Sequence, residues 1–249
     1  MPRASVQVVV TSPPYNVKKP YAGYEDNMEY LQYLNFMRRV FTQVHHVLKD
    51  SGVCFVNIAN CKKNQFKAFD LAYLLRDIGF LLVDSIIWHK PNPRYLNTKR
   101  MLTNAYEFVF MFAKTRKYSI SPLNIGIPRK DEQGLKCRGN VWSINKVFKN
   151  QFVGFKHCAM FPEELPELCV KLCSNPGDLI LDPFMGSGTT AVAAKKLGRH
   201  FIGFEISTEY IKISQERLKK TLEVKHEETI ACPIGLAISD AAICSCAGL

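Results

Sequence analysis

The stretch Leu179–Ala194, LILDPFMGSGTTAVAA, contains an apolar strand, an acidic residue, a glycine-rich turn and the start of a helix. Gly186 and Gly188 allow the backbone to turn sharply and to approach a ligand without interference from a side chain. Strand, turn and helix in this order form the repeating unit of a doubly wound α/β sheet. We therefore expect a mostly parallel sheet with helices packed against it.

Strand and helix patterns alternate on both sides of this stretch, as that fold class requires. The expected strands are Val6–Val10, Val53–Ile58, Phe80–Trp88, Glu107–Phe112, Leu179–Leu181 and Phe201–Phe204. The expected helices are Met28–Leu48, Phe66–Ile78, Glu163–Cys173, a helix after Thr189, and Thr208–Leu222. Residues 114–155 lose this periodicity, and residues 225–249 show no clear pattern.

The glycine turn also predicts a cofactor. Gly186-x-Gly188-x-x-Ala191 satisfies a relaxed dinucleotide fingerprint, and Glu205 lies near the distance expected of a ribose-binding acid. Asp182, however, would repel a pyrophosphate and would suit a ligand that carries an ammonium and a sulfonium centre. S-adenosylmethionine is that ligand. A nicotinamide or flavin dinucleotide and a purely structural turn remain as alternatives.

A second polar turn, Thr11–Asn16 (TSPPYN), follows the first apolar strand. Its two prolines fix the backbone and remove hydrogen-bond donors, so this turn cannot continue a central strand. The Ser12 hydroxyl and the Pro13 carbonyl could accept hydrogen bonds from the exocyclic amino group of a nucleobase. Tyr15 offers a flat face on which an extruded base could stack. The alternative is a polyproline-like turn without a chemical role.

The formal net charge of the 249-residue chain is +11, which favours a polyanionic partner such as nucleic acid. Residues 89–156 contain fourteen Lys or Arg against three Asp or Glu, so this segment alone accounts for +11. An ordinary solvated face is the alternative.

The spacing of the nine cysteines matches neither a zinc site nor a disulfide framework, so we expect no metal. No apolar run is long enough for a membrane helix, and no signal peptide is evident, so we expect a cytoplasmic protein.

Taken together, TSPPYN and DPFMGSGTT resemble the motifs of amino-group DNA methyltransferases of bacterial restriction–modification systems. The proline motif precedes the glycine motif, which is the permuted order of their β group. The segments GVCFVNIAN, IIWHKPNP, NAYEFVFMFAKT and HCAMFPEELPELC support the resemblance, which extends from about Val6 to Leu222. It implies the S-adenosylmethionine-dependent methyltransferase fold.

The resemblance assigns roles to individual residues. The implied catalytic residues are Ser12, Pro13, Pro14 and Tyr15. The implied cofactor-binding residues are Phe161, Pro162, Asp182, Phe184, Gly186, Gly188, Thr189 and Glu205. It also divides the chain into a catalytic half (1–113), a target-recognition insert (114–155), a cofactor-binding half (156–224) and a tail (225–249). Base-reading side chains are expected in the insert, namely Arg116, Arg129, Lys130, Arg138 and Asn140.

In this family, a serine at the first catalytic position usually accompanies methylation of cytosine N4. We therefore expect a DNA methyltransferase that flips a cytosine out of double-stranded DNA and transfers the methyl group directly. The alternatives are adenine N6 methylation, a non-catalytic DNA-binding remnant and, least supported, a dehydrogenase. The expected partners are double-stranded DNA and a restriction endonuclease acting on the same site, and we expect a monomer or dimer.

The chain departs from the family pattern at its N-terminus. Family members usually carry a further strand and helical turn before the catalytic strand, with an acidic residue near the adenine of the cofactor. The last residues, ACPIGLAISDAAICSCAGL, show no pattern that would replace this piece. We therefore expect a sheet that lacks one edge strand, and it is this expectation that motivates the remnant alternative.

Overall fold

The computed structural model describes residues 1–18, 20–21, 24–93, 95, 102–129, 133–147, 160–228 and 242–245. Its helices are α1 (Tyr30–Val47), α2 (Lys67–Ile78), α3 (Glu164–Cys173), α4 (Thr189–Lys196), α5 (Thr208–Glu228) and the 3₁₀ turn η1 (Pro122–Ile125). The strands of the main sheet are β1 (Val6–Thr11), β4 (Leu48–Ile58), β5 (Leu81–His89), β6 (Tyr106–Ala113), β9 (Val141–Ser143), β10 (Leu179–Asp182), β11 (His200–Glu205) and β12 (Ala242–Ser245). Two short hairpins are formed by β2 (Pro20–Tyr21) with β3 (Tyr24–Glu25), and by β7 (Ile127–Pro128) with β8 (Leu135–Lys136).

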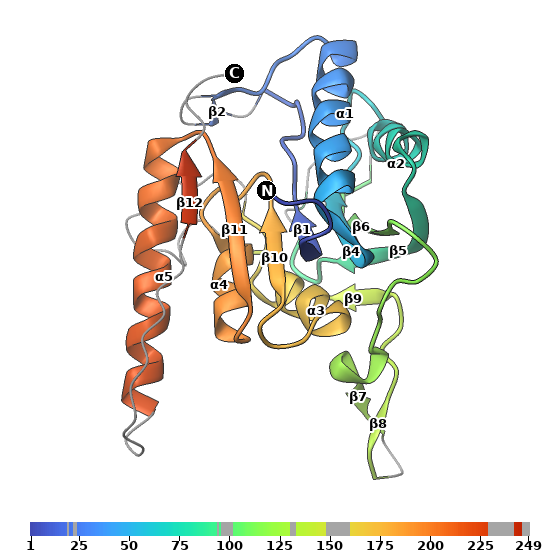
Figure 1. The fold of residues 1–249 in the computed structure, drawn as a ribbon. Coiled ribbons are helices and arrows are strands. Elements are labelled where there is room, and N and C mark those ends of the chain that lie inside the picture. Colours follow the sequence, from blue (N-terminus) through green and yellow to red (C-terminus); the bar gives the residue numbers. More distant parts are fainter. Residues whose placement is uncertain are drawn as a thin grey trace.

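The eight-stranded sheet has the order β12-β11-β10-β1-β4-β6-β5-β9 (Figure 1). Only β6 is antiparallel to its neighbours, and the other strands of the sheet all run in one direction. This arrangement confirms the expected doubly wound, mostly parallel fold. We call the edge where the parallel strands end the carboxyl edge, and the opposite one the amino edge.

Helices cover both faces of the sheet. On one face, α1 and α2 pack over a core that includes Tyr33, Met37, Phe41 and Leu71. The buried α1 residues in this core recur every three or four positions, which places them on one side of the helix. On the other face, α3, α4 and α5 pack over a second core of the remaining inward-facing side chains. Strand β1 lies between these two layers and is buried along its whole length.

The structure corrects the expectation that the sheet lacks an edge strand. Residues Ala242–Ser245, in the tail for which no pattern was expected, form β12 and pair in parallel with β11 from Ile202 to Glu205. A four-residue strand has too few residues to show a periodic pattern in the sequence. Helix α5 also extends beyond its expected end, to Glu228.

The expected insert, residues 114–155, is divided between the two edges. Its first part lies at the amino edge, where the amide of Ser119 donates to the carbonyl of Ser51 and that of Ser121 donates to the carbonyl of Leu172. The β7–β8 hairpin projects below the sheet in the view of Figure 1, in which β10, β11 and β12 point upward. The later part of the insert forms β9, which joins the sheet beside β5 and leads to the carboxyl edge.

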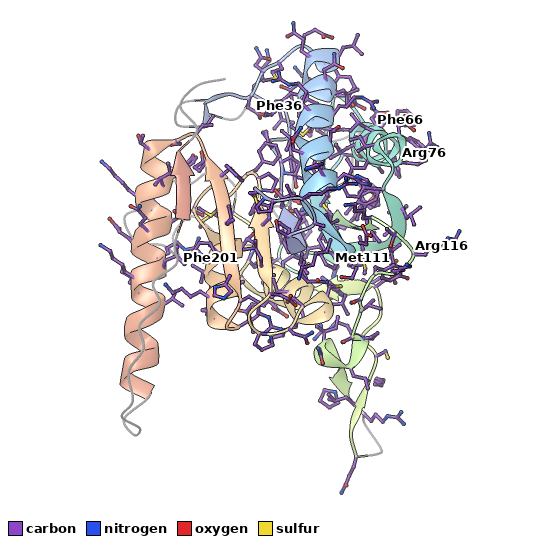
Figure 2. All side chains as sticks on the ribbon, in the orientation of Figure 1. Phe36, Phe66, Arg76, Met111, Arg116 and Phe201 are labelled. Atoms are coloured by element: carbon purple, nitrogen blue, oxygen red, sulfur yellow. The ribbon has the colours of Figure 1, made fainter. Side chains whose placement is uncertain are left out.

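Most apolar side chains of the strands are buried between the layers, whereas most charged side chains of the loops lie at the surface. Figure 2 shows Met111 and Phe201 inside the sheet layers and Arg116 directed outward. Among the helices that the structure describes, none combines the length and the apolar character needed to span a membrane.

Candidate active site

Two turns that are far apart in the sequence meet at the carboxyl edge. We call Ser12–Asn16 the proline turn and Asp182–Thr189 the glycine turn. Strands β1 and β10 are parallel neighbours, with Val9 opposite Leu181, so the turns that follow them lie side by side. The hydroxyl of Thr11 donates a hydrogen bond of 2.7 Å to Oδ1 of Asp182 and so joins them directly.

Asp182 is buried, with 2% of its surface exposed. Its Oδ1 also accepts from the amide of Phe184 at 3.0 Å, and its Oδ2 accepts from the hydroxyl of Thr190 at 2.7 Å. Burial, and to a lesser extent the nearby Glu205 carboxylate, raise the pKa of Asp182 to about 6, against the opposing effect of these hydrogen bonds. Near neutral pH the group is therefore a buried carboxylate that is held by three protein donors.

The glycine turn fits tightly against its surroundings. Gly188 has a φ of +81°, and a Cβ at this position would lie 2.6 Å from Cβ of Ser214 in α5. In β11, a Cβ on Gly203 would lie 1.8 Å from the sulfur of Met185 in the glycine turn. Both glycines are needed because the turn packs directly onto α5 and β11.

Glu205 supports the glycine turn from the end of β11. Its Oε2 accepts from the amide of Gly186 at 2.8 Å, and its Oε1 accepts from the amide of Ser207 at 2.8 Å. Because each carboxylate oxygen has two lone pairs, both oxygens can accept one more hydrogen bond from a ligand.

The start of α3 is tied to the glycine turn through Arg217 of α5. The guanidinium donates to the carbonyl of Ser187 at 2.8 Å, to the hydroxyl of Thr189 at 3.0 Å and to Glu163 at 2.7 Å. Glu163 directly follows Phe161 and Pro162, so this network places both near the glycine turn. Lys196 and Arg217 lower the pKa of Glu163, although its partial burial acts in the opposite direction.

The remaining predicted cofactor residue, Phe184, faces the other layer. Its ring packs edge-on against Phe36 of α1, with ring centroids 6.0 Å apart. Its backbone amide, rather than its ring, contacts Asp182.

The backbone of the proline turn is fixed by two buried charged residues. Asp26, 1% exposed, accepts from the amides of Asn16 and Val17 at 2.7 and 2.8 Å. Lys67, 3% exposed, donates to the carbonyls of Tyr15 and Asn16. A carboxylate therefore holds the amides of this segment and an ammonium group holds its carbonyls.

A chain of polar side chains extends from the proline turn across the sheet. The Tyr15 hydroxyl lies 3.4 Å from Oγ of Ser12 and donates to Oε2 of Glu107 at 2.8 Å. The same Oε2 accepts from the amide group of Asn57 at 3.1 Å. Oε1 of Glu107 forms an ion pair of 3.2 Å with Lys90.

The sequence reasoning missed several of these residues, namely Thr11, Asp26, Asn57, Lys67, Lys90, Glu107 and Arg217. A signal for part of this set was present, because Asn57, Lys90 and Glu107 each stand at an end of an otherwise apolar strand. The last residues of parallel strands gather at one edge of the sheet, and Glu107, near the start of β6, reaches the same edge because β6 runs antiparallel. Lys67 and Arg217 lie within helices, where no pattern separates them from solvated charges.

With this geometry in view, comparison with known proteins is decisive. The sequence profile described as DNA methylase, of the N6/N4 type, matches residues 6–216. The chain belongs to the N6/N4 DNA methylase family. A relative of this DNA methylase is the Type II methyltransferase M.Cfr9I of Citrobacter freundii, which is 33% identical over 256 residues, with 88% of this chain and 83% of the relative covered.

Solved structures agree with the fold of this DNA methylase. PvuII DNA methyltransferase, a cytosine-N4-specific protein, has a TM-score of 0.73 at 23% identity, covering 91% of this chain and 86% of that one. That likeness concerns the fold alone. M1.HpyAVI, solved as a complex with S-adenosylmethionine, has a TM-score of 0.61 at 26% identity, covering 86% of this chain and 89% of that one.

Proposed function

We infer that this DNA methylase transfers a methyl group from S-adenosylmethionine to the exocyclic N4 of a cytosine in double-stranded DNA. One observation carries the proposal: the hydrogen bond of 2.7 Å between Thr11 and Asp182 holds the proline turn and the glycine turn together at one edge of the sheet. A base-binding turn and a cofactor-binding turn must be neighbours if a methyl group is to pass directly between their ligands.

The residues around the glycine turn fit S-adenosylmethionine. The Glu205 oxygens each have a lone pair left for a ribose hydroxyl. Because Asp182 is only 2% exposed and is held by three protein donors, that residue would act through its negative charge rather than by direct contact. Phe161, Pro162, Phe184 and Thr189 complete the proposed cofactor set.

When bound, S-adenosylmethionine supplies a methyl carbon that is already activated by its sulfonium centre. The protein's task is to improve a poor nucleophile, since the lone pair of the amino nitrogen is delocalised into the base. The Ser12 hydroxyl and the Pro13 carbonyl accept hydrogen bonds from the amino group and so localise this lone pair. The prolines, Asp26 and Lys67 keep these acceptors in place.

The target base would leave the duplex and stack on Tyr15, at a cost of about a few kcal/mol for unstacking and unpairing. The proton that the amino group loses passes to solvent or to a neighbouring acceptor, and no covalent intermediate with the protein is required. Serine at position 12 favours cytosine over adenine, and adenine N6 methylation is the competing outcome of the test below.

That test is nucleoside mass spectrometry of unmethylated genomic DNA incubated with the protein and S-adenosylmethionine. N4-methylcytosine is expected as the product, and a Ser12→Ala variant should lose most of the transfer rate while it retains its fold. Appearance of N6-methyladenine alone would replace cytosine by adenine in the proposal. If a correctly folded protein produced no methylated base, that result would support the non-catalytic remnant. The structure does not favour this alternative, because β12 occupies the sheet edge that was expected to lack a strand.

The DNA-facing surface follows from the position of the site. Among the described residues of the insert, Arg116 and Arg129 belong to the part at the amino edge, whereas Lys130 lies outside the described residues. Arg138 and Asn140 hold the fold, because they bond to the carbonyl of Ile125 and to Asp84. The expectation that these residues read bases is therefore poorly supported for a base bound at the carboxyl edge.

Two exposed lysines at the carboxyl edge are better placed. Lys62 and Lys63 form the tip of a tight turn in which Cys61 and Asn64 bond to each other through both backbone groups, at 3.1 and 3.0 Å. This turn follows β4, and Lys62 is only five residues from Asn57, which limits their separation to about 17 Å. A phosphate that flanks the target base would lie within the reach of such a turn.

We expect Lys62→Gln/Lys63→Gln to weaken DNA binding and to reduce the slope of log K against log salt by about 2, because each lost phosphate contact removes about 0.9 from the slope. Fluorescence anisotropy with a labelled duplex over a range of salt concentrations measures this. Arg116→Gln/Lys117→Gln, which removes the same charge from exposed positions at the amino edge, is the matched control. Equal changes from the two pairs would contradict the proposed orientation.

The remaining partners are proposed with the function. The relative M.Cfr9I is named a Type II methyltransferase, which supports a restriction endonuclease that acts on the same DNA site. A monomer or dimer in the cytoplasm is consistent with such a role. The division of the chain into catalytic half, target-recognition insert and cofactor-binding half is proposed on the same basis.

A further inference from the structure

The proposed roles of the two turns leave one feature of the site unexplained. Lys90 and Glu107 form an ion pair in which only 10% and 17% of the side chains are exposed. Withdrawing two charges from water costs several kcal/mol per ion, which the attraction between them repays only when the geometry is good. An ion pair at this depth, beside the proline turn, therefore calls for an explanation from the site itself.

The strand register places the members of this cluster on one face of the sheet. Side chains two residues apart on a strand share a face. Glu107 is thus on the side of Val109, Asn57 on that of Phe55, and both neighbours belong to the core under α3 and α4. Because β6 runs antiparallel to β4 and β5, its first residues meet the last residues of those strands at the carboxyl edge.

Three donors converge on the Glu107 carboxylate. Oε2 accepts from the Tyr15 hydroxyl at 2.8 Å and from Asn57 at 3.1 Å, while Oε1 faces Lys90 at 3.2 Å. The Tyr15 hydroxyl also lies 3.3 to 3.4 Å from atoms of Ser12 and Asn57. The bond to Glu107 is therefore the strongest of these contacts, since bonds to an ionised acceptor are shorter and stronger than neutral ones.

We propose that Glu107, itself held by Lys90 and Asn57, is a positioning residue that fixes the ring of Tyr15 against the flipped base. This inference rests on the proposed function, in which Tyr15 stacks on that base. The ring of Tyr15 is partly buried against the core under α1 and α2, and its hydroxyl end keeps the freedom to swing unless hydrogen bonds hold it. Anchoring the hydroxyl at the far end of the ring removes this freedom before the base arrives, so that less ordering remains to be done in the reaction.

Glu107→Gln tests the proposal because glutamine has the same shape as glutamate but replaces one of the two acceptor oxygens by an NH₂ donor. Tyr15 and Asn57 donate to Oε2 of Glu107 and Lys90 donates to Oε1, whereas a glutamine has a single amide oxygen. In either orientation of the amide group, the Tyr15 hydroxyl loses its charged acceptor and meets a neutral group, to which its bond is weaker. Tyr15→Phe removes the same hydrogen bond from the other side.

The decisive measurement is a double-mutant cycle on the single-turnover rate of methyl transfer to genomic DNA, with cofactor and DNA saturating. We expect each single variant to be slower by about tenfold, as loss of one hydrogen bond to a charged group suggests. The double variant should be no slower than either single variant, because both changes break the same bond. The dissociation constant for S-adenosylmethionine should remain unchanged throughout.

A merely structural role for Glu107 would give a different pattern. The two effects would then multiply, to about a hundredfold loss in the double variant, and that result would overturn the proposal. A crystal structure of the Glu107→Gln variant gives a readout without activity: the Tyr15 ring should be displaced while Ser12 and Asp182 stay in place, and an undisplaced ring would also overturn it. Failure of the proposed function is distinct, since the wild-type protein would then methylate adenine instead of cytosine, or no base at all.

Discussion

Gly188→Ala should lower the free energy of unfolding by about 2–5 kcal/mol, the sum of a left-handed backbone penalty and an overpacking penalty. The φ of +81° at this position disfavours any residue with a Cβ. The new methyl group would also lie 2.6 Å from Cβ of Ser214 and 3.2 Å from its Cα, and the Cα belongs to the backbone of α5 and cannot rotate away. Urea denaturation followed by circular dichroism measures the loss.

Gly177→Ala separates the two causes. Gly177 has a φ of +85°, but a Cβ there would meet no atom within 4 Å. This control should lose only the backbone penalty, about 1–2 kcal/mol. The Gly188 variant should in addition bind S-adenosylmethionine at least tenfold more weakly in calorimetry, because α5 and the start of α4 must move apart. Equal losses of stability in the two variants would show that the contact with Ser214 is not tight.

Asp182→Asn should gain stability relative to the wild-type protein as the pH rises from about 4 to 7, while weakening the cofactor site. Burial raises the pKa of Asp182 from 3.8 to about 6, so between these values the folded protein binds more protons at this group than the unfolded chain does. The free energy of unfolding therefore falls as the pH rises through this window, and the group costs up to about 3 kcal/mol above pH 6. An asparagine, which does not ionise, escapes this cost.

The measurement is the difference in unfolding free energy between the Asp182→Asn variant and the wild-type protein at several pH values. It should grow in favour of the variant between about pH 4 and pH 7, offset by a pH-independent loss from the altered hydrogen bonds to Thr11 and Thr190. Asp77→Asn, at a side chain that is 48% exposed on α2, should show no such growth. A difference for Asp182→Asn that does not depend on pH would contradict this account. Weaker S-adenosylmethionine binding by the same variant would mark the buried charge as one retained for function at the expense of stability.

Much of the fold could be predicted from the sequence because most elements carry their own signals. The strand β10, the glycine turn and helix α4 follow from apolar residues, glycines and helical spacing within sixteen consecutive residues, Leu179–Ala194. Helix α1 shows the recurrence of buried residues that its apolar pattern predicts. The short strands β9 and β12 could not be predicted, since three or four residues at or near a sheet edge are specified by the partner strand rather than by a pattern of their own.

For the candidate site, the sequence by itself determined which residue types are present: a rigid proline turn, a glycine turn and an acidic residue after each of two strands. Only the tertiary structure decided how they combine. The contact between Thr11 and Asp182 spans 171 residues of sequence, and that between Tyr15 and Glu107 spans 92. Such pairs depend on strand order, which arises from the packing of whole layers and leaves no local trace. The same holds for the edge at which each lysine lies, because a charge in a loop has no periodic partner to reveal its direction.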